Sequence, residues 1–176
     1  MENQDLEQFN LKQSHYGYSG VNLDILQQGA SQYTLVTIVV DTSSSVGPFK
    51  ADLEKAIKST VEACSKSPRS DNLLIRIVTF ASHMSELHGF KLLPMIKTAD
   101  YDNCLNCGGM TSLFAATENA IEATSDYGKT LSADGDMDVN AIVVIVTDGA
   151  NNMTGTTDNV AQALKKALKN EHLESL

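Results

Sequence analysis

The stretch YTLVTIVVDTSSS (residues 33–45) contains the change of composition that decides the fold. Its first part, residues 34–40, is a short and nearly continuous apolar run rich in β-branched residues, which predicts a strand buried on both faces. Its second part, residues 41–45, places five oxygen-bearing side chains in a row. A helix cap needs only one such residue, so the remaining oxygens require another explanation.

Buried strands and amphipathic helices alternate along the rest of the chain. Apolar runs predict two further buried strands, and apolar residues at helical spacing predict three helices: strands at 73–81 and 140–149, and helices at 49–64, 113–125 and 160–168. The segment 84–95, with Gly89 at its centre and Pro94 near its end, is typical of a hairpin-like piece at a sheet margin.

This alternation predicts an α/β fold. We expect a mostly parallel, doubly wound (Rossmann-like) sheet with helices on both faces and one antiparallel edge strand. Residues 1–32 are polar and rich in turn residues, so they are predicted to form an N-terminal arm, and residues 33–176 are predicted to form the domain.

Composition restricts the class of partner and the compartment. The chain has 22 acidic and 13 basic residues and a net charge of −9, which disfavours nucleic acid and anionic membranes, because both attract clustered Lys and Arg. The first residues, MENQDLEQFN, lack the basic and apolar regions of a signal peptide. Three cysteines without framework spacing fit reduced thiols. These features predict a cytoplasmic protein.

Three segments could bring oxygen atoms together: DTSSS (41–45), GGMTS (108–112) and TDGAN (147–151). In parallel α/β sheets, ligands bind beyond the carboxyl ends of the strands, where the strand order reverses. If the strands that end at Asp41 and Asp148 are neighbours, both carboxylates face one crevice. Hydroxyl and carboxylate oxygens without His or Cys suit a hard divalent cation, Mg2+, Mn2+ or Ca2+. Two carboxylates under-neutralise such an ion, so we expect it to keep a position for water or an incoming carboxylate.

The same three segments resemble a known motif. In this order, D-x-S-x-S, a threonine behind a glycine pair and TDG are similar to the metal ion-dependent adhesion site (MIDAS) of von Willebrand factor A-type domains, the integrin I-like family. The family's usual glycine between the two serines is Ser44 here, which leaves both serine ligands in place. The resemblance implies that hydroxyls bind the ion directly and carboxylates bind it directly or through water. The implied metal ligands are Asp41, Ser43, Ser45, Thr111 and Asp148.

The resemblance also implies a function. It suggests a protein–protein interaction module of the intracellular bacterial or phage type, and not an enzyme, in which the bound cation contacts an Asp or Glu carboxylate of a protein partner. Intracellular members often act as adaptors in larger assemblies, including assemblies with AAA+ ATPases. Two alternatives stay open: a metal-assisted hydrolase with Asp41 or Asp148 as base or nucleophile, and a structural component of a virion.

The family normally continues with two further strand–helix passes after the last helix predicted here, so its C-terminal strands are expected to be missing from this chain. The hydrophobic strand at 140–146 would then have an open edge, which is an aggregation hazard. We therefore expect the N-terminal arm or a second chain to lie at that edge, the latter by self-association.

Weaker motifs have simpler explanations. DTSSS by itself would fit a helix-capping turn. Cys104 and Cys107 form only half of a zinc site, which needs four ligands, so free thiols are expected. Residues 134–140 imitate the start of an EF-hand loop, but Val139 and Ile145 occupy the positions that require glycine and glutamate.

Overall fold

The computed structural model describes residues 8–11, 17–21, 32–135, 137–149, 151–153 and 155–169. The strands are β1 (Gln8–Leu11), β2 (Tyr18–Val21), β3 (Gln32–Asp41), β4 (Leu73–Phe80), β5 (Met84–Leu92) and β6 (Asp138–Val146). The α-helices are α2 (Lys50–Ser65), α3 (Leu113–Gly135) and α4 (Thr157–Leu168). The short 3-10 helices are η1 (Ser44–Phe49), η2 (Ser70–Asn72), η3 (Leu93–Met95) and η4 (Thr98–Tyr101).

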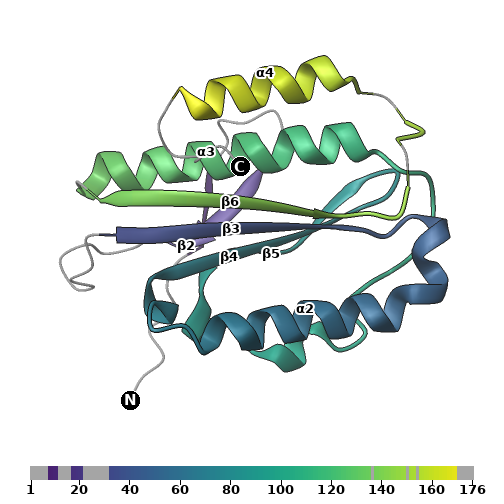
Figure 1. The fold of residues 1–176 in the computed structure, drawn as a ribbon, viewed down its shortest axis with the longest axis horizontal. Coiled ribbons are helices and arrows are strands. Elements are labelled where there is room, and N and C mark those ends of the chain that lie inside the picture. Colours follow the sequence, from purple (N-terminus) through teal and green to yellow (C-terminus); the bar gives the residue numbers. More distant parts are fainter. Residues whose placement is uncertain are drawn as a thin grey trace.

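The strands form one sheet in the order β1-β2-β5-β4-β3-β6. Strand β3 is parallel to both of its neighbours, β4 and β6, whereas β5 is antiparallel to β4. Helices cover both faces of this sheet (Figure 1). The predicted α/β fold with a mostly parallel, doubly wound sheet is therefore confirmed.

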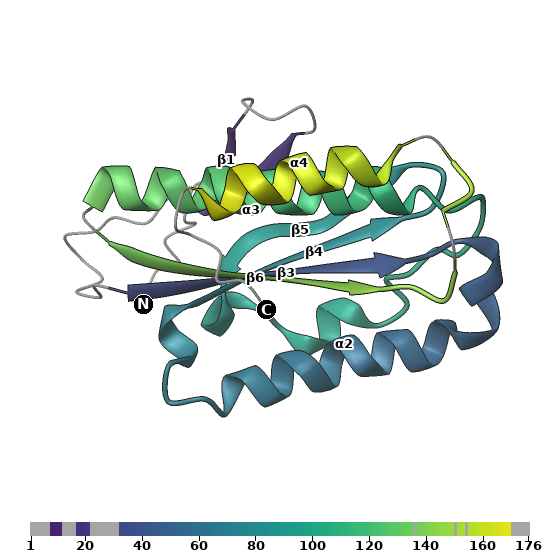
Figure 2. The same ribbon diagram turned by 45° about the horizontal axis from the view of Figure 1, so that its top comes forward.

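The helical layers follow from the apolar faces of the helices. Helix α2 covers one face and buries Ile57 and Val61 against β3 and β4 side chains. Helix α3 covers the opposite face, where Ala120 is buried. Helix α4 lies outside α3 and packs Ala163 and Ala167 on it (Figure 2). The small alanine side chains allow the helices and the sheet to approach closely.

The register between β3 and β6 positions the ends of both strands. The pairing runs without interruption from Gln32↔Asp138 to Val40↔Val146. Because the strands are parallel, the segments DTSSS and TDG leave the sheet at the same end and side by side. The two strands that lead to Asp41 and Asp148 are therefore neighbours, which is the condition for both carboxylates to face one crevice.

The N-terminal arm lies at the opposite edge from the one expected. Strands β1 and β2 form an antiparallel pair, and β2 pairs in parallel with β5 through Gly20↔Phe90. Strand β5 offers an anchor there, because the Ser19 N–H and hydroxyl donate to the Glu86 carboxylate at 3.2 and 2.6 Å. The expectation that the N-terminal arm covers the edge of the 140–146 strand is therefore wrong for β1 and β2. The expectation that the 84–95 segment forms an edge strand is also wrong, because β5 lies between β2 and β4. The arm's other residues lie outside the described residues.

Helix α3 is longer than predicted. The pattern suggested that the helix ends near Ser125 and that a polar surface segment follows, but α3 continues to Gly135. The reason is that Tyr127 and Leu131 keep the helical spacing and are buried against the sheet. The Tyr127 hydroxyl also donates to the Val21 carbonyl at 2.7 Å. Despite its length, neither α3 nor another helix in the described ranges is apolar enough to cross a membrane.

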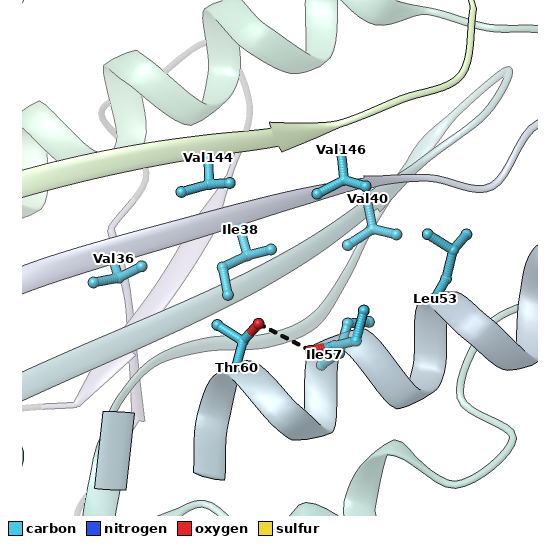
Figure 3. A pocket seen from close by; sticks show the side chains of 9 residues that line it. Val36, Ile38, Val40, Leu53, Ile57, Thr60, Val144 and Val146 are labelled. Carbon is cyan, nitrogen blue, oxygen red and sulfur yellow. Dashed lines mark hydrogen bonds between the residues drawn. The ribbon is translucent and has the colours of Figure 1, made fainter. Parts of the chain in front are cut away.

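Strand β6 is exposed on one face, although its sequence predicted burial on both. Helix α2 lies over β3 and β4, so Ile142, Val144 and Val146 remain 46, 42 and 38 % exposed. Within the described part of the chain, β6 pairs only with β3. A groove of about 110 Å3 lies between α2 and these strands (Figure 3). Its apolar lining includes Val36, Ile38, Val40, Leu53, Ile57, Val144 and Val146.

Candidate metal centre

The DTSSS segment turns away from the sheet. Hydrogen bonds of its second and fourth residues, Thr42 and Ser44, fix this turn. The Thr42 N–H and hydroxyl both donate to the Phe80 carbonyl at the end of β4, at 2.7 and 3.0 Å. The Ser44 N–H and hydroxyl both donate to the Gly109 carbonyl, each at 3.1 Å. Thr42 and Ser44 thus attach the segment to two other parts of the chain.

Four of the five predicted ligands are linked by short contacts. The Ser43 and Ser45 hydroxyls share a hydrogen bond of 3.1 Å, and the Ser45 hydroxyl donates to Asp148 Oδ1 at 3.0 Å. The Ser43 N–H donates to Asp41 Oδ1 at 2.8 Å. Residues 43, 45 and 148 therefore place a continuous row of side-chain oxygens beside the buried Asp41.

The fifth predicted ligand, Thr111, lies on a loop that is joined to both other segments. Its N–H donates to Asn152 Oδ1 at 2.6 Å, and its carbonyl accepts from the Asn152 N–H at 3.1 Å. Both hydrogen bonds use the backbone of Thr111 and neither uses its hydroxyl. Gly109 of the same loop has φ +83°, a conformation that favours glycine. An added Cβ there would also approach Ser82 Oγ to 2.7 Å.

The structure also identifies positioning residues whose roles the sequence pattern did not indicate. The Thr147 hydroxyl donates to Asp41 Oδ2 at 2.7 Å, so it orients the buried carboxylate. Asn152 holds Thr111, as described above. The loop after β4 is a fourth component, because Ser82 Oγ accepts from the Met110 N–H at 3.0 Å. The run TDGANN could have suggested Asn152, whereas nothing in the sequence links residue 82 to the site.

The spacing of the oxygens fits a small divalent cation. Neighbouring ligand oxygens in an octahedral Mg2+ site lie about 2.9 Å apart. The Ser43–Ser45 and Ser45–Asp148 separations of 3.1 and 3.0 Å are close to the Mg2+ value. Asp41 is 1 % exposed, and the ion pairs described in this structure include neither Asp41 nor Asp148. A buried carboxylate without a cationic partner is unfavourable, so the donor set suits a cation.

The cysteines offer a poorer donor set. Cys104 and Cys107 are free thiols. Burial raises the pKa of the Cys107 thiol; Lys50 opposes this shift, while Glu54 and Asp41 add to it. A protonated thiol is a weak metal ligand. The described residues also contain no cluster of three or more His, Cys, Asp or Glu side chains suited to a metal. Serine and threonine hydroxyls are therefore essential to a site here.

Solved structures share this fold. The chain is similar to proximal thread matrix protein 1 from the mussel byssus, with 21 % identity, a TM-score of 0.57, and coverage of 82 % of this chain and 35 % of that one. A second structure of that protein, described as having a zinc-occupied MIDAS motif, matches at 23 % identity and TM-score 0.54, over 81 % of this chain and 34 % of that one. The PilB minor pilin from Streptococcus sanguinis matches at 17 % identity and TM-score 0.51, over 68 % of this chain and 30 % of that one. This chain thus spans about one third of their lengths.

Among curated proteins, no sequence matches this chain. The model of the von Willebrand factor type A domain matches residues 36–171, which include all three segments of the candidate metal centre. The match covers well over half of the sequence. The chain therefore belongs to the von Willebrand factor type A domain family.

Proposed function

We propose that this chain is a metal-dependent protein-interaction module. In this proposal a divalent cation binds the end of the sheet and accepts an Asp or Glu carboxylate from a protein partner. The observation that carries the proposal is the row of oxygens from Ser43 through Ser45 to Asp148, beside the buried Asp41. Domains of this family typically mediate protein–protein interactions.

The five predicted ligands would have different roles. The hydroxyls of Ser43, Ser45 and Thr111 would bind the cation directly, and Asp148 would contribute charge at the exposed side. Asp41 would contribute negative charge from its buried position. The Ser43 N–H and the Thr147 hydroxyl already orient its two oxygens. The bound cation supplies a positive charge that attracts a carboxylate. Three hydroxyls and two carboxylates leave room for that carboxylate.

We propose Mg2+ as the ion, because the separations between neighbouring oxygens are close to those in an octahedral Mg2+ site. Mn2+ prefers the same oxygen donors. The relative with a zinc-occupied MIDAS supports a divalent ion in a site of this type.

The cellular role that we propose is that of a cytoplasmic adaptor in a larger assembly, such as one with an AAA+ ATPase, and not that of an enzyme. We also propose self-association through the edge of β6, which has no paired strand among the described residues and exposes apolar side chains. The hydrolase alternative uses the same oxygens with Asp41 or Asp148 as base.

The first test measures metal binding through thermal stability. Ligands that bind only the folded state stabilise it, so Mg2+ at about a hundredfold excess over its Kd should raise the melting temperature by about 5 °C or more. Asp148→Asn should remove this shift. Asp138→Asn, at the other end of β6, changes the same charge and should retain it. An unchanged melting temperature in millimolar Mg2+ and Mn2+ would contradict a metal centre.

The second test measures the interaction. The immobilised chain should capture a protein from an extract of its native host in Mg2+ and release it in EDTA, and Asp148→Asn should capture none. Recovery of the same proteins with and without EDTA would contradict the proposal. Metal-dependent hydrolysis of p-nitrophenyl phosphate or p-nitrophenyl acetate that Asp41→Ala abolishes would favour the hydrolase.

A further inference from the structure

Strand β5 is irregular at His88, a partly buried residue that the candidate metal centre does not use. The pairs that it forms with β4 in this region are Ile75↔Lys91, Ile77↔His88 and Val78↔Glu86. Between successive pairs, β5 includes one more residue than β4, so a bulge lies on either side of His88. Bulges commonly re-aim a side chain.

The bulge between Glu86 and His88 directs their side chains to opposite faces of the sheet. In a regular strand, residues two apart share a face. Glu86 accepts from Arg76, which also donates to Asn119 of α3 at 3.2 Å, so Glu86 lies on the α3 face. His88 contacts Tyr101, which is packed in the apolar cluster against α2. The strand thus places an imidazole in the layer between the sheet and α2.

The hydrogen bonds of His88 identify its tautomer. Nδ1 lies 2.8 Å from the Gly89 carbonyl oxygen, and a carbonyl can only accept, so Nδ1 carries a proton. Nε2 lies 2.7 Å from the Tyr101 hydroxyl oxygen. In the neutral imidazole, Nε2 accepts from that hydroxyl. Both side chains are then satisfied.

Uptake of a second proton removes this match. Both nitrogens of an imidazolium donate, so the Tyr101 hydroxyl would have to accept from Nε2 and direct its own proton elsewhere. Tyr101 is 1 % exposed, and the described hydrogen bonds give its hydroxyl no partner other than His88. A buried donor without an acceptor is unfavourable. Protonation of His88 therefore favours separation of the two side chains.

The groups around the imidazole set the pH at which it titrates. Burial lowers the pKa of His88, and the hydrogen bond to the Gly89 carbonyl opposes this shift. Lys91 of β5 lowers the pKa further, whereas Glu86 of β5 and Asp100 of η4 raise it. The net shift is downward from the ordinary value of about 6.5. The neutral form therefore predominates at neutral pH.

Tyr101 supports the loop that leads from η4 to the metal centre. After η4 the chain contacts α2, where the fully buried Leu105 donates its N–H to Glu54 at 3.1 Å. The Gly108 N–H then donates to the Thr42 carbonyl of the DTSSS segment at 2.8 Å. The loop is thus tied to β5 at one end and to the DTSSS segment at the other.

We propose that proton uptake by His88 weakens cation binding at the metal centre, because it releases Tyr101 and the loop that holds the DTSSS segment. The inference rests on the proposed function, since the metal centre is the site that responds. The released form of His88 titrates near its ordinary pKa of about 6.5, and the packed form titrates at a lower pH. The Mg2+ affinity should therefore be constant above about pH 6.5 and fall as the pH decreases below it.

The test measures the Mg2+ affinity by calorimetry at pH 7.5 and pH 5.5. The wild-type affinity should be about threefold or more weaker at the lower pH. His88→Gln keeps an acceptor for the Tyr101 hydroxyl and cannot take up a proton, so its affinity should change by less than about 1.5-fold. His83→Gln is the matched control: it removes an exposed imidazole next to Ser82 and should keep the wild-type pH dependence.

The reciprocal measurement uses the wild-type chain alone. Because the coupling between two bound ligands is mutual, saturating Mg2+ should move the titration midpoint of the His88 ring, followed by NMR, to lower pH. This measurement tests the inference even if His88→Gln does not fold.

Four results would overturn the inference: a wild-type affinity that is equal at both pH values, an equal loss in His88→Gln, loss of the pH dependence in His83→Gln, or a His88 midpoint that Mg2+ leaves unchanged. If the wild-type chain binds no Mg2+ at pH 7.5, it is the proposed function itself that fails.

Discussion

At the scale of single residues, the alternation in DTSSS separates two tasks. The Ser43 and Ser45 hydroxyls are hydrogen-bonded to each other beside the Asp41 carboxylate, whereas Thr42 and Ser44 donate to the Phe80 and Gly109 carbonyls. Each hydrogen bond contributes only about 1 kcal/mol. Their combined effect is to fix the positions of the ligand oxygens before an ion binds.

Thr111 permits a test at this scale. Thr111→Val keeps the shape of the side chain and removes its hydroxyl. The two hydrogen bonds described for Thr111 use its backbone, so both can remain. If the hydroxyl is a ligand, the affinity for Mg2+ measured by calorimetry should fall by about tenfold or more, as expected for the loss of roughly 1.4 kcal/mol. The free energy of unfolding in EDTA should change by less than about 0.5 kcal/mol.

Ser112→Ala is the matched control for this prediction. The Ser112 hydroxyl donates to the Ser82 carbonyl at 3.3 Å and is not in the ligand set. Its loss should lower the stability in EDTA by about 1 kcal/mol and leave the Mg2+ affinity unchanged. The reverse pattern, with Thr111→Val destabilising the metal-free chain and Ser112→Ala weakening Mg2+ binding, would assign Thr111 a structural role.

At the scale of elements, β2 joins the sheet through a close approach that only glycines allow. Arg76 of β4 is 1 % exposed and donates through Nε to Glu86 at 2.6 Å, while Glu86 accepts from Ser19 of β2. A Cβ at Gly89 would lie 2.1 Å from the Ser19 carbonyl oxygen, and a Cβ at Gly20 would lie 2.7 Å from the Tyr127 ring. Strand β2 is therefore closely fitted to β5 and to helix α3.

Gly89→Ala tests this fit. The new methyl group would collide with backbone, so β2 should move away from β5, and hydrogen exchange of the 18–21 amides should become about tenfold faster or more. Exchange in β3 should change little. Gly17→Ala is the control, because a Cβ at Gly17 meets nothing within 4 Å. Unchanged protection of β2 in Gly89→Ala would contradict the described packing.

At the scale of the whole molecule, the two edges of the central sheet differ in their strand pairing. The β1–β2 pair extends the sheet at β5, whereas β6 has a free edge in the described part of the chain. Its sequence DVNAIVVIV has no Lys or Pro, and its register with β3 is continuous, so three devices that commonly protect an edge are missing from β6 itself: lysine, proline and a β-bulge. A groove of about 110 Å3 lies beside it.

Val144→Lys tests self-association at this edge. In light scattering, the mass of the wild-type chain should rise with concentration toward at least twice the monomer mass. Val144→Lys should remain monomeric, because an inserted charge opposes edge pairing. Ala161→Lys adds the same charge on the exposed side of α4 and should behave like wild type. A wild-type chain that stays monomeric at all concentrations would contradict self-association.

The sequence by itself determined β3, β4 and β6, the alternation of α and β elements after residue 32 and the motif that the three segments share. These features follow from local patterns: β-branched apolar runs, helical spacing, and hydroxyl residues after a strand. It also predicted that Asp41 and Asp148 end neighbouring strands; β3 does end at Asp41 and pairs with β6, whereas β6 ends at Val146, two residues before Asp148.

Only the tertiary structure decided which distant groups meet. The anchoring of the arm on β5, the exposed face of β6, and the roles of Ser82, Thr147 and Asn152 depend on contacts between residues far apart in sequence. The β6 run has the same composition as a buried strand, and its exposure follows from the position of α2. The physical reason is that hydrophobic patterning records whether a face is apolar, whereas burial depends on what the rest of the chain places against it.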